Sequence, residues 1–161
     1  MKIKSFFAFT SNLDKALITI HYQTKDNVIP ASNSVMAKNL FQLSTYFNNS
    51  YYERISHQIL MFLLPEIDYP SAFSNWMDLA LNYSEQNKEL AVCGQEALTH
   101  YAKINSQYIP NVILAGTLKE FTFPFLNSRF HNQETLFYLC KNKTCLIPNT
   151  DYLQINNDLI K

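Results

Sequence analysis

Glycine is scarce in this chain, and the motifs of nucleotide binding are absent from it. The 161 residues include only two glycines, Gly94 and Gly116, so neither G-x-G-x-x-G nor G-x-x-x-x-G-K-[ST] is present. Thirteen basic residues balance 13 acidic ones, and the formal net charge is zero. A nucleic-acid surface or a polybasic membrane patch needs concentrated Lys and Arg. We therefore expect neither nucleic acid nor a membrane as a partner.

Cysteine and long apolar runs are also scarce. The chain has three cysteines and no C-x-x-C motif. The apolar run at residues 6–9 is too short for the core of a signal peptide. The longest run, residues 59–64, is far below the length of a membrane span. We expect a cytoplasmic protein without a disulfide scaffold.

The first half of the sequence predicts a short β-hairpin followed by three helices. Residues 17–23 alternate in the period of two that a pleated strand requires. Ser32 or Asn33 can cap the first helix, and Ser50 with Glu53 forms a capping box for the second. The first helix is apolar on more than one side, which indicates packing on two sides. The expected elements are strands at residues 6–10 and 17–23 and helices at 34–47, 51–64 and 71–82.

The second half predicts a small α/β unit that follows a polar linker. A strand at residues 89–93, a helix at 95–107 and a strand at 112–115 form a βαβ unit, whose right-handed crossover makes the two strands parallel. A further strand at 135–139 is expected to pair antiparallel with residues 145–147. The sequence therefore predicts an α+β chain with a helical domain at residues 1–84 and an α/β subdomain at 85–161.

Several ordered motifs resemble the carboxy-terminal end of the thioredoxin-domain-containing proteins related to spermatogenesis-associated protein 20. The resemblance covers nearly the whole chain. The motifs are DNVIPASNSVMAKNLFQLS from Asp26, YPSAFSNWMDLAL from Tyr69, ELAVCG from Glu89, YIPNVILAG from Tyr108 and YLCKNKTCLIPNTD from Tyr138.

The resemblance implies a fold and a limited function. Members of that family carry a thioredoxin-like domain followed by an α/α toroid similar to six-hairpin glycosidases. This chain then corresponds to the last helices of the toroid and a small βαβ-containing appendage, as a fragment, a split gene product or a truncated paralogue. The resemblance also implies a non-catalytic subunit linked to carbohydrate metabolism, with no cofactor. Its partner is the missing thioredoxin/toroid portion or a second copy of the chain.

The turn before the first helix holds the candidate residues for a sugar-like ligand. In toroid proteins such loops line the open mouth of the ring, so Asp26, Ser32, Asn33 and Ser34 are substrate-binding candidates, and Trp76 is a candidate stacking platform. Another interpretation is purely local. Asp, Asn and Ser are common turn and cap residues, and an aromatic residue on a helix stripe is commonly part of the core.

Cys140 and Cys145 are the redox candidates. The four intervening residues, 141–144, form an expected hairpin loop that places the two side chains opposite each other. Three interpretations are open: reduced structural thiols, a reversible dithiol, or a metal site completed by Cys93 and His131. No metal is predicted, because the spacing is unlike that of known zinc sites. A small redox module is therefore the alternative function.

Overall fold

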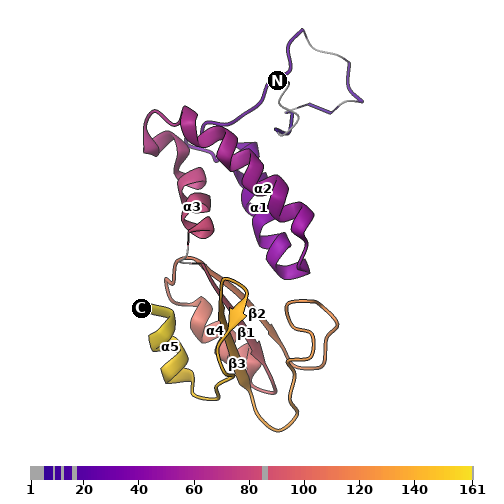
Figure 1. Cartoon of the computed structure of the whole chain (residues 1–161), viewed down its shortest axis with the longest axis vertical. Coiled ribbons are helices and arrows are strands. Elements are labelled where there is room, and N and C mark those ends of the chain that lie inside the picture. Colours follow the sequence, from indigo (N-terminus) through magenta and orange to yellow (C-terminus); the bar gives the residue numbers. More distant parts are fainter. Residues whose placement is uncertain (1–5, 9, 12, 16–17, 85–86, 161) are drawn as a thin grey trace. The chain divides into compact units, whose positions relative to one another are not determined.

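The computed structural model describes residues 6–8, 10–11, 13–15, 18–84 and 87–160 (Figure 1). Their contacts divide the chain into two compact units: residues Met1–Ser44 with Asn49–Ala80, and residues Thr45–Asn48 with Leu81–Lys161. The described residues form five α-helices and a four-stranded mixed sheet. The expected α+β class is confirmed, whereas the toroid stays a prediction. None of the helices in this part of the chain has the length and apolar character that crossing a membrane requires.

The first unit is helical. Ser56 on the second helix donates a hydrogen bond through Oγ to the Ala37 carbonyl of the first, at 2.7 Å. The core is apolar, and its buried members include Phe41, Leu60 and Trp76. The helices are α1 (Ser32–Phe47), α2 (Ser50–Leu63), the short 3-10 helices η1 (Leu64–Glu66) and η2 (Pro70–Phe73), and α3 (Ser74–Tyr83).

The cap of α2 lies one residue earlier than the sequence predicts. Asn49 has an extended backbone, and its side chain accepts hydrogen bonds from the N–H groups of Tyr51 at 3.0 Å and Tyr52 at 3.2 Å. Ser50 is already the first residue of the helix. The capping box predicted for Ser50 and Glu53 is therefore wrong, because an asparagine immediately before the serine satisfies the free N–H groups first.

The predicted β-hairpin is also wrong where the structure can be described. No strand forms at residues 6–8, 10 or 18–23, and residues 9 and 17 lie outside the described part. Ile18 and Ile20 are 104% and 63% exposed, so the alternating pattern buries neither of these side chains. Instead of pairing with each other as strands, the two segments form backbone hydrogen bonds to the Asn33 side chain. Its Oδ1 accepts from the Phe7 N–H at 2.7 Å, and its Nδ2 donates to the carbonyls of Phe7 and Gln23, both at 3.0 Å.

The second unit contains the sheet, with strand order β2-β1-β3-β4. Strand β1 pairs in parallel with β2 and antiparallel with β3, and β3 pairs antiparallel with β4. The predicted parallel βαβ unit and the antiparallel return are thus confirmed. The elements are β1 (Lys88–Cys93), α4 (Ala97–Asn105), β2 (Val112–Thr117), β3 (Leu136–Lys141), β4 (Thr144–Cys145) and α5 (Tyr152–Ile160).

One face of the sheet carries the main core of the second unit, and α4 and α5 cover it (Figure 1). Helix α5 is absent from the sequence prediction. The Asp151 side chain caps this helix by accepting from the N–H of Leu153 at 2.8 Å, and Lys88 Nζ donates to the Leu159 carbonyl at its other end, at 2.8 Å. The buried members of the core are Leu90, Val92, Ala97, Ile104, Phe137, Leu139, Ile155 and Leu159.

A tight turn joins β3 to β4. Asn142 and Lys143 have left-handed backbones, with φ of 51° and 61°, as the two central residues of a type I′ hairpin turn do. The strands therefore extend to Lys141 and Thr144. Two residues, rather than the predicted four, form the loop between the paired strands.

Candidate functional site

The candidate site lies on the face of the sheet opposite the main core. Side chains alternate between the two faces of a strand. Leu90, Val92, Phe137 and Leu139 belong to the core beneath α4 and α5, so Ala91, Cys93, Tyr138 and Cys140 face the other way. Cys93 and Cys140 are both buried.

Cys140 and Cys145 form a disulfide on this face. The two residues are directly paired between β3 and β4, with an S–S distance of 2.06 Å and a Cα–Cα distance of 3.8 Å. Cys140 is only 1% exposed, whereas Cys145 on the edge strand is exposed. Of the two cysteines, Cys145 is the one that a second molecule can reach.

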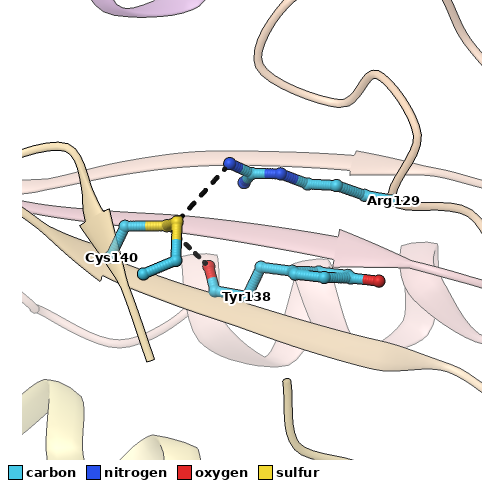
Figure 2. The surroundings of a disulfide bond; sticks show 4 residues. Arg129, Tyr138 and Cys140 are labelled. Atoms are coloured by element: carbon cyan, nitrogen blue, oxygen red, sulfur yellow. Dashed lines mark hydrogen bonds between the residues drawn. A yellow bond between two sulfur atoms is a disulfide. The ribbon is translucent and has the colours of Figure 1, made fainter. Parts of the chain in front are cut away.

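Arg129 lies beside the disulfide, as Figure 2 shows. Its Nη2 is 3.6 Å from Sγ of Cys145. The guanidinium stacks on two aromatic rings, 5.6 Å from the Phe125 centroid and 5.3 Å from that of Tyr138. Its Nη1 is buried and has no hydrogen-bond partner. The site thus combines an accessible sulfur with a cation whose donor capacity is only partly used.

The connection between β2 and β3 positions Arg129 by a series of local hydrogen bonds. Phe125 and Leu126 are buried and anchor this segment, and the Arg129 N–H donates to the Leu126 carbonyl at 3.2 Å. Ser128 has a left-handed backbone with φ of 59°, and its N–H donates to Oε1 of Glu120 at 3.2 Å. The backbone that carries Arg129 is therefore held at several points.

Cys93 is a different kind of thiol. It is free and fully buried, and burial raises its pKa from 9.0 to about 11, with Arg129 lowering and Glu120 raising the value to smaller extents. Burial also raises the pKa of Tyr138. Because the thiolate is the reactive form of cysteine, Cys93 is unreactive at neutral pH.

The Asp26 carboxylate of the first unit is fully engaged by the protein. Its Oδ1 accepts hydrogen bonds from the Ala31 N–H at 2.9 Å, Ser34 Oγ at 2.7 Å and Asn75 Nδ2 at 3.3 Å. Its Oδ2 accepts from the Asn75 N–H at 3.0 Å. Asp26 is 4% exposed. The structure brings Asp26 and Ser34 together, in a network that joins the loop to α1 and α3.

The other candidates from the first unit have separate environments. The Asn33 amide binds the backbone of the segment before α1, as described above. Ser32 is exposed, and its N–H donates to Oε1 of Gln23 at 3.4 Å. Trp76 is 0% exposed, and its Nε1 donates to the Thr24 carbonyl at 2.7 Å. In this structure the Trp76 ring packs within the core and presents no face for stacking.

Among the described residues of the second unit, two surface hollows have a volume large enough for a small ligand. The first, of about 360 Å³, is lined by aromatic side chains that include Tyr101 and Phe123, and the Tyr46 hydroxyl at its wall donates to the Leu114 carbonyl at 3.1 Å. The second, of about 400 Å³, contains Lys88 and Lys141, and Lys88 already caps α5. Neither hollow contains a cluster of reactive groups.

Metal binding finds no support among the described residues, since nowhere in that part of the chain do three His, Cys, Asp or Glu side chains gather as a metal ion requires.

Sequence reasoning identified Cys140 and Cys145 but missed Arg129. The available signal was weak: Arg129 is one of only two arginines in the chain, and it lies 16 residues before Cys145.

Comparisons with models of protein families, with curated proteins and with solved structures found no match. The family resemblance described above therefore stays a prediction, and the candidate site must be interpreted from its own chemistry.

Proposed function

We propose that the second unit is a reversible dithiol–disulfide module in which Cys145 exchanges with a partner and Cys140 resolves. The observation that carries the proposal is the contact between the accessible Cys145 sulfur and the Arg129 guanidinium, at 3.6 Å. A disulfide that serves stability alone needs no cation beside its exposed sulfur. A thiol that must react as a thiolate gains from one, because nearby positive charge stabilises the thiolate.

The exchange balances as two substitutions at sulfur. A partner thiolate attacks Sγ of Cys145, the S–S bond breaks, and Cys140 leaves as a thiolate that takes a proton from water. A second partner thiolate then attacks the partner sulfur of the mixed disulfide and releases Cys145 as a thiolate beside Arg129. Two electrons pass from the partner dithiol to this protein. The same steps in reverse oxidise the module.

Burial decides the roles of the two cysteines. Cys140 is 1% exposed and lies next to the Tyr138 carbonyl oxygen, 3.9 Å from its Sγ (Figure 2). A partner thiolate cannot approach Cys140 in line with the S–S bond, whereas Cys145 lies on the edge strand. In the reducing compartment that the sequence predicts, disulfides are usually transient, catalytic or redox-sensing, which also favours a reversible bond.

Single-cysteine variants test this assignment of roles. We expect the Cys145 thiol in Cys140→Ala to react with an aromatic disulfide reagent at pH 7 at least about tenfold faster than the Cys140 thiol in Cys145→Ala, because access and thiolate content both favour Cys145. Stopped-flow absorbance measures both rates in the full chain. Adding Arg129→Gln to Cys140→Ala should slow the reaction.

Unfolding in urea is the internal control, because it should make the two thiols react at similar rates. Equal rates in the folded protein, or no response to Arg129→Gln, would contradict the proposal.

A second candidate function rests on the exposed apolar side chains of α1 and α2. We propose that these helices pack against the remaining helices of a toroid of the family that the sequence resembles, as a non-catalytic subunit. Several large apolar residues on the two helices are between 39% and 58% exposed, and each forfeits part of the roughly 1.5–3 kcal/mol that burial provides. They are Val35, Met36, Leu43, Tyr51 and Met61.

Light scattering with a dye that binds exposed apolar surface tests this second candidate. We expect dye binding and self-association of the chain alone, and loss of both when toroid helices are supplied in trans. The double variant Met36→Lys and Met61→Lys should prevent the association without unfolding the chain, because both positions are exposed. A monodisperse monomer that binds no dye would contradict it.

A further inference from the structure

The exchanging sulfur lies on a strand whose outer edge pairs with no other strand that the described residues form. Strand β4 is the last strand in the sheet order. The N–H of Leu146, the residue after β4, donates to the Leu139 carbonyl of β3 at 2.9 Å. In an antiparallel pair, alternate residues direct their backbone groups toward the neighbouring strand. The backbone N–H and C=O of Cys145 therefore point to the outer edge, away from β3.

The segment after Cys145 extends this edge and then interrupts it. Asn149 exchanges backbone hydrogen bonds with Phe137, at 2.8 and 3.1 Å. Between this bridge and the Leu146 bond, the outer segment contains one residue more than β3, which makes a bulge. Leu146 and Ile147 at the bulge are 61% and 91% exposed. An apolar patch thus lies directly next to the accessible sulfur.

Three basic side chains lie near the same edge. Arg129 contacts Cys145, and Lys141 and Lys143 lie on the exposed hairpin turn. A second copy of this chain that paired edge to edge would bring these like charges together, which is unfavourable. A segment with an acidic residue beside its cysteine is complementary to this edge.

We propose that the outer edge of β4 is a docking surface for an extended, cysteine-bearing segment of a partner protein. The segment adds to the sheet as a further strand by pairing with the backbone of Cys145. Its cysteine then lies against the Cys145 sulfur, an apolar side chain covers Leu146 and Ile147, and an acidic side chain faces the lysines. This inference rests on the proposed function, since it identifies the partner of that exchange as a polypeptide thiol rather than a small one.

A thiol-displacement assay tests the docking in the full chain. Cys145 of the Cys140→Ala variant is first converted to a mixed disulfide with a coloured aromatic thiol. A peptide of about eight residues with one cysteine, flanked by Glu and Leu, then displaces that group and forms a mixed disulfide with Cys145. The comparisons are the same peptide N-methylated on the backbone next to its cysteine, and free cysteine methyl ester.

We expect the unmodified peptide to react about tenfold faster per thiolate than its N-methylated form, because N-methylation removes the strand hydrogen bonds. Ile147→Asp should slow the peptide several-fold and leave the reaction of the small thiol unchanged. Lys38→Gln, a substitution in the first unit, is the matched surface control and should leave both rates unchanged.

The outcomes separate this inference from the proposed function. Equal rates for the two peptides and the small thiol would overturn the docking surface and leave the dithiol module intact. Faster formation of a disulfide-linked dimer of the chain than of the peptide adduct would also overturn it, because the occupant would then be a second copy. Failure of the single-cysteine test described above would overturn the proposed function itself.

Discussion

The two units each contain a charged side chain that the protein treats in opposite ways. In the first unit, the Asp26 carboxylate is buried and accepts four hydrogen bonds from Ala31, Ser34 and Asn75. In the second, the Arg129 guanidinium has a buried Nη1 with no partner and an Nη2 that reaches only a sulfur atom. Among the described residues, no carboxylate forms a salt bridge with it.

This difference separates a charge with a structural role from a charge that can take part in a reaction. A buried charge whose hydrogen bonds are all made stabilises one conformation. A cation that is held by aromatic rings and lies beside an exchangeable sulfur keeps unused N–H donors. When that sulfur becomes a thiolate, the cation can form a new charge-assisted interaction with it. We therefore interpret Asp26 as a structural residue and Arg129 as the residue that tunes the disulfide.

The largest expected effect comes from breaking the satisfied charge. Asp26→Ala leaves the Ala31 and Asn75 N–H groups without their acceptor, and we expect it to lower the free energy of unfolding of the first unit by roughly 3–5 kcal/mol. Trp76, the only tryptophan in the chain, is buried in this unit, so its fluorescence in a urea titration reports on the change.

Lys38→Gln is the matched control for Asp26→Ala. Lys38 forms a salt bridge with the part-exposed Asp78 on α3 and donates to Oδ1 of Asn75 at 3.4 Å, and such contacts near the surface contribute about 1 kcal/mol or less. If Asp26→Ala were no more destabilising than this control, the carboxylate would not be the structural centre of the unit.

Reduction of the disulfide should have the next largest effect. The bond closes a loop between residues separated by five positions, and opening so short a loop removes about 2 kcal/mol of stabilisation. Cys93 is buried in the same unit, so its labelling rate by a thiol reagent measures how often this unit opens. We expect a Cys140→Ala and Cys145→Ala double variant to show about 30-fold faster labelling of Cys93 under native conditions. Unchanged labelling would mean that the disulfide does not stabilise the unit.

Alkaline pH should destabilise the second unit through Cys93. The folded-state pKa of this thiol is about 11, against 9.0 for the free group, so between these values the unfolded chain releases a proton that the folded chain retains. The free energy of unfolding therefore has its full value below pH 9. It falls by on the order of 2 kcal/mol as the pH rises toward 11. Urea titrations at pH 8 and pH 10.5, followed by far-UV circular dichroism, measure the loss. Cys93→Ala should lose less than the parent chain over this interval, and an equal loss would assign the effect to other groups.

The sequence predicts elements well where the signal is local. Pro65 and Pro70 delimit the helices of the first unit, and the apolar strands of the second unit, which are buried by their neighbours, produce the βαβ pattern. The alternation at residues 17–23 misleads, because a period of two shows that a segment can pleat and does not supply a partner strand. Helix α5 is missed because its two buried apolar residues, Ile155 and Leu159, indicate a helix only when the sheet that they pack against is known.

The candidate site is predicted only in part, for a related reason. Cys140 and Cys145 are close in sequence, so a hairpin suffices to bring them together. Arg129 reaches Cys145 only because the connection after β2 folds back over the sheet, with Phe125 and Leu126 as its anchors. Nothing in the local sequence specifies that return, which depends on tertiary packing. The Asp26 network also depends on tertiary packing, since Asn75 donates to Asp26 from 49 residues away in the sequence.

The reduction equilibrium of the Cys140–Cys145 disulfide tests the central claim most directly. Arg129 stabilises the reduced module through the Cys145 thiolate, by about 1 kcal/mol for a part-exposed charge pair. Measured against a glutathione buffer at pH 7, the reduction potential of Arg129→Gln should therefore be about 20 mV more negative than that of the parent chain. Arg129→Lys, which retains the charge, should lie between the two. Arg54→Gln removes a stacked arginine from Tyr51 in the first unit, where the ring centroid is 5.2 Å away, and should leave the potential unchanged. A potential that is the same in the parent chain and in Arg129→Gln would contradict the assignment of Arg129 as the residue that tunes this disulfide.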